Sequence, residues 1–143
     1  MLRSLLSASL VVVLLAGCGQ GPPPPRTESN VRDRLMSLGI AYNRIGKAPK
    51  DEETFRKALG SAEPSTLSRF HIHSPDELFV SPRDNQPFVI RYGTPPGVPG
   101  SMKDILAYEQ VGARGTRFVL YSDPYVDEVS AAKWKEIAPP DAQ

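Results

Sequence analysis

Two histidines, His71 and His73, are the pair whose residue type and spacing best suit a metal ion. On an extended segment, side chains at i and i+2 point to the same side of the chain, so both imidazoles can approach one divalent ion. A metal site needs a third or fourth ligand, and the sequence supplies none at a recognisable spacing. We therefore interpret the pair as surface histidines beside a turn, with a metal site as the alternative.

Asp123 and Asp127 are a second candidate metal site, because they flank a turn and could bind calcium together with backbone carbonyl oxygens. The Asp-x-Asp-x-Asp-Gly pattern of calcium loops is absent. Asp123 precedes Pro124, and aspartate before proline initiates ordinary turns because its carboxylate bonds nearby backbone amides. We predict a turn rather than an ion site, and we expect no cofactor.

Glu109 is the acidic residue that could act as a general base or ligand, since it stands in a run of otherwise uncharged residues. Arg91 and Arg117 lie in neighbouring predicted strands. A cross-strand ion pair would contribute ~0.2–1 kcal/mol to stability. No second acid or histidine is placed beside Glu109 by the sequence, so we predict a structural ion pair rather than a catalytic group.

Other catalytic patterns are missing from the sequence, and we predict that the protein is not an enzyme. No Gly-x-Ser-x-Gly or His-Glu-x-x-His motif occurs. The proline- and glycine-rich loop 93–100 lacks the Gly-Lys-Ser/Thr ending of a phosphate-binding loop. The aromatic residues of the predicted sheet region are expected in the core or at its rim; they are Tyr92, Tyr108, Phe118, Tyr121 and Trp134.

Residues 1–17 are predicted to be a bacterial export signal that ends before a lipid-modified cysteine. Arg3 supplies a positive start, and the apolar segment from Leu5 to Leu15 is shorter than the ~20 residues that span a bilayer. The four residues from Leu15 to Cys18 (Leu-Ala-Gly-Cys) resemble the lipobox of bacterial lipoproteins. That resemblance implies acylation of Cys18 and a protein held on a membrane of the cell envelope. Because Cys18 is the only cysteine, the sequence excludes an intrachain disulfide and a cysteine-based zinc site.

The length of 143 residues suits one domain. Residues 18–27 are the predicted anchor and tether, because four consecutive prolines favour an extended polyproline helix. Residues 28–138 are the predicted head domain and 139–143 a tail. The whole chain has 17 Lys and Arg and 16 Asp and Glu, so without Arg3 it carries 16 of each and is formally neutral. We therefore expect no nucleic-acid partner, which would need clustered positive charge.

The first folded element is predicted to be an amphipathic helix that is capped by Ser29 or Asn30 and stops at Gly46. Its apolar residues recur at spacings of three and four and so share one face; they are Val31, Leu35, Leu38, Tyr42 and Ile45. The side assigned to solvent carries Arg32, Asp33, Arg34, Asn43 and Arg44. A second, short helix is expected over 51–59, with acids in its first turn and Gly60 as its stop.

Short strands are expected after residue 70. The apolar runs 78–81, 88–92, 105–109, 117–121 and 125–129 are the predicted strands. A hairpin turn at 112–115 separates the third strand from the fourth, and Ser130 caps a final helical turn at 131–137. Helices first and a strand meander afterwards predict an α+β fold, with the two N-terminal helices packed on a small antiparallel sheet.

Four short segments resemble those of bacterial pseudopilin-like exported proteins. They are Leu-Gly-Ile-Ala-Tyr-Asn at 38–43, Ser-Pro-Arg-Asp at 81–84, Leu-Ala-Tyr-Glu at 106–109 and Phe-Val-Leu-Tyr-Ser-Asp-Pro-Tyr-Val at 118–126. The resemblance implies a soluble head domain in which a helix precedes a short antiparallel sheet. Two departures argue against filament assembly: a lipobox and a proline-rich tether replace the long apolar helix, and Asp123-Pro124-Tyr125 stands where the group usually has Asp-Gly-His.

These features lead us to expect a lipid-anchored envelope protein with a structural or protein-interaction role. The alternative is an envelope lipoprotein that holds a small ligand or divalent metal in its strand loops. A deep pocket lined by Glu109, Asp123 or His73 would favour the alternative, whereas a filled head with a shallow surface would favour the interaction role.

Overall fold

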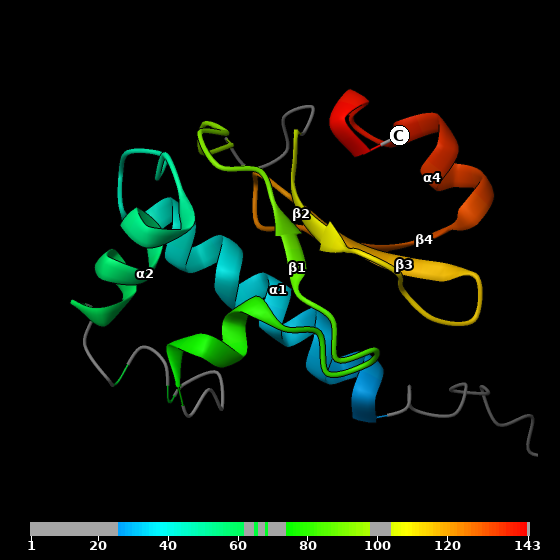
Figure 1. Ribbon diagram of the computed structural model, residues 1–143, viewed down its shortest axis with the longest axis horizontal. Helices are drawn as coiled ribbons and strands as arrows, with labels where there is room; N and C mark the ends of the chain where they lie inside the picture. Colours follow the sequence, from blue (N-terminus) through cyan, green and yellow to red (C-terminus); the bar gives the residue numbers. More distant parts are fainter. Residues whose placement is uncertain (1–25, 62–64, 66–67, 69–73, 98–103, 143) are drawn as a thin grey trace, which may run out of the picture.

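The computed structural model describes residues 26–61, 65, 68, 74–97 and 104–142. In these residues, helices and a four-stranded antiparallel sheet form the predicted α+β fold (Figure 1). The long helix α1 (Arg26–Arg44) crosses one face of the sheet, and the short helix α4 (Ala131–Ile137) lies on the other. No helix in the described part of the chain is both long and apolar enough to cross a membrane.

Helix α1 buries the predicted apolar face against the sheet. Its four most central apolar side chains are fully buried; they are Val31, Leu35, Leu38 and Tyr42. The helix begins at Arg26, so the expected start at Ser29 or Asn30 was wrong. It ends at Arg44, one residue before the predicted last residue Ile45, and Gly46 follows with a φ of +73°, the left-handed conformation that glycine adopts without a steric penalty.

Three polar residues that were assigned to the solvent side of α1 are instead half-buried, and that prediction was wrong for them. Arg32 donates to the carbonyl of Val126, and Asn43 donates to the carbonyl of Ser122 at 3.0 Å. Arg34 donates to two carbonyls in the segment before the sheet, 3.2 and 3.0 Å away. Long polar side chains can lie along an apolar interface and still satisfy carbonyls at its edge, so periodicity alone does not reveal their burial.

Helix α2 (Glu52–Gly60) packs beside the C-terminal half of α1. Asp51 caps it, since its carboxylate accepts from the Thr54 amide at 2.8 Å. Phe55 is buried and meets Tyr42 edge-on, with ring centroids 5.5 Å apart. The helix includes Gly60 rather than stopping before it, one residue beyond the prediction.

The strand predicted at 78–81 was wrong. The segment Pro75–Phe79 forms a 3₁₀ helix, η1, and only Val80 makes an isolated bridge, to Pro87. Pro75 lies in the first turn of η1, where its fixed φ fits helical geometry. A strand would point Leu78 and Phe79 to opposite sides, whereas the helical turn brings both into the α1 core.

The sheet consists of β1 (Phe88–Ile90), β2 (Ile105–Glu109), β3 (Thr116–Tyr121) and β4 (Val126–Ser130), in that spatial order. The first strand is two residues shorter than predicted, and the other three agree within one residue. A register shift between Ile105 and Ala107 in β2 interrupts the alternation of side chains, so that Leu106 and Ala107 both belong to the core on the α1 side, whereas Ile105 and Tyr108 belong to the core on the α4 side. The predicted cap of α4 is present, because the Ser130 hydroxyl accepts from the Lys133 amide at 3.2 Å.

The α4 face of the sheet has its own smaller core. Trp134 lies 4.6 Å from the ring of Tyr108, and the guanidinium of Arg117 lies over the indole at 4.4 Å. Residues of the expected tail take part as well, since Pro140–Ala142 forms a 3₁₀ helix, η2, and Ala142 packs against this core. The sheet is therefore covered on both faces.

The β2–β3 turn depends on two glycines with positive φ. Arg114 and Gly115 at its tip have φ values of 53° and 77°, as a type I′ hairpin requires, and Ala113 and Thr116 exchange backbone hydrogen bonds of 2.9 and 3.0 Å. Gly112 has a φ of +78°, and a Cβ there would lie 2.2 Å from the carbonyl oxygen of Thr116. No atom lies within 4 Å of the corresponding Cβ position at Gly115.

We expect Gly112→Ala to destabilise the fold more than Gly115→Ala does. Both substitutions force alanine into a left-handed conformation, which costs about 1–2 kcal/mol. Only Gly112→Ala also drives a methyl group into the backbone, so it should cost a further ~1–3 kcal/mol, as overpacking does. Urea unfolding of the chain from Gly19 onward measures both, and equal losses would contradict the close packing at Gly112.

Candidate functional site

The most extensive polar cluster in the described residues surrounds Glu109, at the last position of β2. Two segments far apart in sequence bring partners to it: the turn at 81–84 before β1, and β3. Three of the four segments that carry the family resemblance therefore meet at one carboxylate. They meet because the turn at 81–84 folds back onto the sheet and because its side chains point toward the end of β2.

The turn at 81–84 is fixed by its own hydrogen bonds. The amide of Ser81 donates to the carbonyl of Gln86, and the amide of Asn85 donates back to Ser81, both at 2.9 Å. One carboxylate oxygen of Asp84 accepts from the Gln86 amide at 3.0 Å, and the other accepts from the Gly112 amide at 3.1 Å. This turn is thereby tied to the β2–β3 turn, and Arg83 is aimed at the sheet.

Glu109 is fully buried, and both of its carboxylate oxygens accept two hydrogen bonds. Oε1 accepts from the hydroxyl of Ser81 at 2.7 Å and from Nε of Arg83 at 3.3 Å. Oε2 accepts from Nη2 of Arg83 at 2.5 Å and from the backbone amide of Phe118 at 2.9 Å. A buried carboxylate is tolerated only when such partners replace its lost hydration.

Arg83 is almost as buried, with 7% of its side chain exposed. Besides Glu109, it donates to Oε1 of Glu128 at 2.8 Å and to the carbonyl of Thr116 at 3.1 Å, and it lies 4.7 Å from the ring centre of Phe118. Burial tends to lower the pKa of Arg83, but hydrogen bonds with the two carboxylates outweigh it and raise that pKa. The guanidinium is therefore permanently charged and joins three strands to the turn.

Glu128 forms the outer edge of this cluster. Burial tends to raise its pKa, but hydrogen bonds from the Thr116 hydroxyl and from Arg83 outweigh that effect and lower it. Because the folded-state pKa lies below the unfolded one, this group stabilises the fold above its unfolded pKa, and the stabilisation is lost as the pH falls through the folded pKa.

The predicted partners of Glu109 were wrong. Arg91 lies 3.6 Å from the carboxylate of Asp141, and Arg117 contacts only the backbone carbonyl of Glu109, at 3.3 Å. Side chains alternate along a strand, so Arg117 points to the face opposite Phe118, toward α4. The charge that does neutralise Glu109 comes from Arg83, in a turn that sequence alternation cannot place.

The carboxylate of Glu109 is not accessible to a substrate. Every oxygen of the Glu109 carboxylate already accepts from protein donors, and its side chain has no exposure to solvent. A general base needs access to the proton that it removes. The structural interpretation of Glu109 therefore holds, and it is a clasp between a turn and a sheet rather than a reactive group.

The other candidate residues do not form a site in the described part of the chain. Asp127 uses a carboxylate oxygen to accept from the Glu128 amide at 2.9 Å, and Asp123 lies in the β3–β4 turn, as predicted. No group of three or more metal-ligating side chains occurs among the described residues. His71, His73 and Cys18 lie outside them.

The hollows lined by described residues include two of similar volume. One, of about 320 Å³, lies between α4 and η2 and is lined by Trp134, Lys135, Ala138 and Ala142. The other, of about 300 Å³, lies beside the segment after β1 and is lined by residues 91–95 and Asp104. Neither is lined by Glu109 or Asp123.

The aromatic residues serve the two cores or their rims. Phe118 and Tyr108 are buried on opposite faces of the sheet, and Tyr92 packs edge-on against Phe55 with ring centroids 6.5 Å apart. Burial is the main cause that raises the pKa of Tyr92, so its hydroxyl stays neutral.

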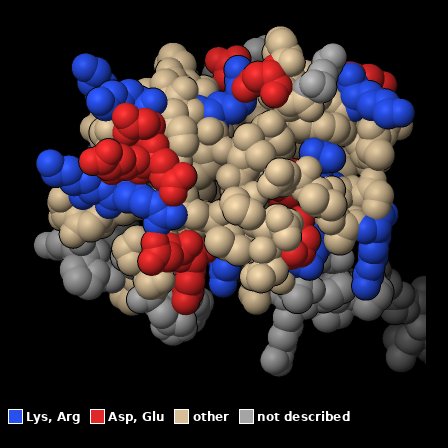
Figure 2. Space-filling model, in the orientation of Figure 1, with Lys and Arg blue, Asp and Glu red and all other residues tan. Residues whose placement is uncertain are grey.

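Charged side chains of both signs are interleaved at the α2 end of the molecule (Figure 2), where Arg56 pairs with Glu52 at 2.6 Å.

The sequence offered one signal that could have identified the clasp: an arginine and an aspartate together in a Ser-Pro turn.

Comparison of the chain with protein-family models, with curated proteins and with solved structures finds no match.

Proposed function

We propose that this protein is a lipid-anchored component of the bacterial cell envelope, with a small head domain that has a structural or protein-interaction role. The anchor is Cys18, at the end of the Leu-Ala-Gly-Cys segment. The head domain resembles that of pseudopilin-like exported proteins. The protein acts through its surface and not through a reaction.

The observation that supports the interaction role is that both carboxylate oxygens of Glu109 are already hydrogen-bonded to groups of the protein itself. The one fully buried acid of the described residues makes four hydrogen bonds within the protein and stabilises the fold. A ligand-binding or catalytic site instead keeps polar groups directed into an accessible cavity. The two hollows described above are lined by residues other than Glu109 and Asp123.

Replacement of the anchor cysteine tests the membrane part of the proposal. We expect Cys18→Ala to move the protein from the membrane fraction to an unprocessed or soluble form, because no thiol remains to carry lipid. Gly19→Ala is the matched control, since it keeps the thiol and should remain with the membrane. Detergent phase partitioning and labelling with an alkyne fatty acid measure both, and equal partitioning of Cys18→Ala and wild type would refute the anchor.

The interaction part is tested by crosslinking in intact cells, followed by purification of the full-length protein. A partner that crosslinks to wild type and to Gly19→Ala supports it. Recovery of a stoichiometric small molecule or metal ion with the purified protein would instead favour the ligand-binding alternative.

A further inference from the structure

The β2–β3 turn presents an apolar and a basic side chain to solvent at its tip. Val111 is 64% exposed, the highest value among the exposed large apolar residues of the described chain, and Arg114 is exposed three residues later. A single exposed valine needs no explanation by itself. The position of Val111 is informative because the β2–β3 turn lies at the end of the molecule to which the proposed anchor is attached.

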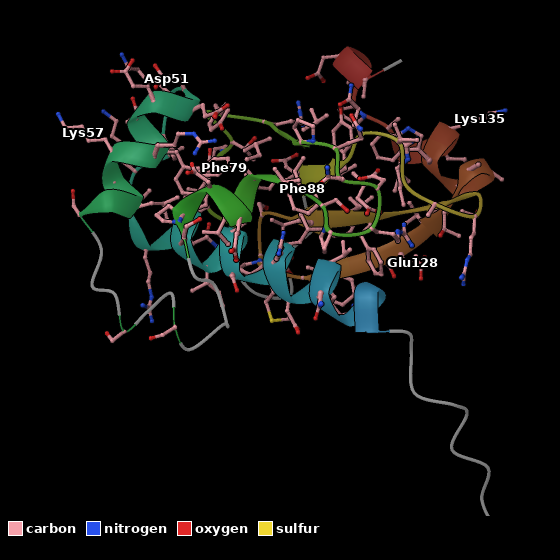
Figure 3. The ribbon with its side chains drawn as sticks, turned by 60° about the horizontal axis from the view of Figure 1, so that its bottom comes forward. Asp51, Lys57, Phe79, Phe88, Glu128 and Lys135 are labelled. Atoms are coloured by element: carbon pink, nitrogen blue, oxygen red, sulfur yellow. The ribbon has the colours of Figure 1, made fainter. Side chains whose placement is uncertain are left out.

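The turn lies at the end of the molecule where α1 begins. Figures 1 and 3 share the same horizontal axis, and in both the start of α1 and the β2–β3 turn lie at the right-hand end. The contacts agree, because Asn43 near the end of α1 bonds the carbonyl of Ser122 in the β3–β4 turn, at the opposite end of the sheet. Consecutive turns of an antiparallel meander lie at opposite ends.

The chain between the anchor and α1 is short. Seven residues, 19–25, separate Cys18 from Arg26. At the ~3.1 Å per residue of a polyproline helix, a segment of this length would span about 25 Å from Cys18 to the helix. A head held this close to a bilayer, and attached at one end, has that end nearest to the lipid.

We propose that the β2–β3 turn rests on the membrane surface, with Val111 at the boundary between headgroups and acyl chains and Arg114 against anionic phospholipid headgroups. This inference rests on the proposed lipid anchor at Cys18. At the same end of the molecule, most charged side chains in view are Lys or Arg (Figure 2), and Lys135 of α4 projects there (Figure 3).

Hydrogen bonds within the β2–β3 turn fix its backbone conformation. Its tip is a type I′ hairpin closed by two backbone hydrogen bonds, and the Gly112 amide is bonded to Asp84 at 3.1 Å. The backbone that carries Val111 and Arg114 is therefore fixed before it meets the lipid, so little backbone entropy is lost on contact.

One valine and one arginine bind a membrane weakly on their own. The anchor changes this, because it converts the contact into an intramolecular event at a high effective concentration. Apolar contact and attraction to anionic lipid then act together, as they do in other surface-bound proteins. The contact orients the head and leaves the β3–β4 end directed away from the bilayer.

The lone cysteine makes a direct test practical. In the lipidated full-length protein the thiol of Cys18 is consumed, so Val111→Cys introduces a single site for a polarity-sensitive fluorophore. Tyr125→Cys is the matched control, since Tyr125 is 49% exposed in the β3–β4 turn. Both labelled proteins are reconstituted in vesicles of phosphatidylethanolamine and phosphatidylglycerol that contain a nitroxide-labelled lipid.

We expect the probe at position 111 to emit at shorter wavelength and to be quenched more strongly than the probe at position 125. Arg114→Glu should reduce the quenching at 111, and so should vesicles without phosphatidylglycerol. Equal emission and quenching at the two positions, in protein that floats with the vesicles, would overturn the orientation and leave the anchor intact. Protein that does not float with the vesicles would overturn the anchor and this inference with it.

Discussion

Glu109→Gln is expected to destabilise the head domain by about 3–5 kcal/mol, the range found when one member of a buried ion pair is removed. Glutamine keeps the shape of the side chain but removes the negative charge that faces Arg83 across 2.5 Å. Its amide NH₂ also places donors where an oxygen now accepts from Arg83 or from the Phe118 amide. Urea unfolding of the chain from Gly19 onward measures the loss.

Glu136→Gln is the matched control, because Glu136 pairs with Lys133 at 2.8 Å on the exposed surface of α4. An exposed pair of this kind contributes ~0–1 kcal/mol. Arg83→Met completes the test: if the clasp is one unit, the double variant loses much less than the sum of the single losses. Similar small losses for Glu109→Gln and Glu136→Gln would show that the buried pair does not hold the turn to the sheet.

Leu38→Ala is expected to cost about 2–5 kcal/mol, because it removes packed methyl groups and leaves a cavity. Leu38 is completely buried at the centre of the face that α1 packs on the sheet. A helix that merely extended the tether would lose almost nothing from this change. The free energy of unfolding therefore reports whether α1 is an integral part of the head.

The control for Leu38 is Asp33→Ala, which should change stability by no more than ~0.5 kcal/mol, since Asp33 is exposed on the same helix. Arg34, which periodicity places on the solvent side, is unsuitable, because it bonds the carbonyls of Glu77 and Val80. Equal, small losses for Leu38→Ala and Asp33→Ala would refute the docking of α1.

Much of the fold follows from local patterns. The spacing of Leu35, Leu38 and Tyr42 identifies the buried face of α1, because a helix repeats every 3.6 residues and only one face meets the sheet. Residues 105–130 read as strand, turn and strand because apolar runs alternate with glycine and aspartate-proline turns. The segment 78–81 misled the same reasoning, since a short apolar run does not distinguish a strand from a 3₁₀ turn that Pro75 begins.

The partners of Glu109 could not be predicted from local sequence patterns. The isolation of Glu109 in an uncharged strand correctly marks it as an acid that needs a partner, and the structural interpretation follows. Its partner depends on which face of each neighbouring strand an arginine occupies and on where the turn at 81–84 folds back. Both depend on strand register, and a shift of one residue would turn every side chain to the other face.

The sequence by itself determined the α+β order of elements, the apolar face of α1, the cap of α4 and the hairpin at 112–115, because each depends on residues within a few positions of one another. Only the tertiary structure decided that Arg83 neutralises Glu109, that Arg32 and Asn43 are half-buried, and that the β2–β3 turn lies at the end where α1 begins. These features join residues that are far apart in the chain, and their contacts exist only once the sheet has its register and the helix is docked.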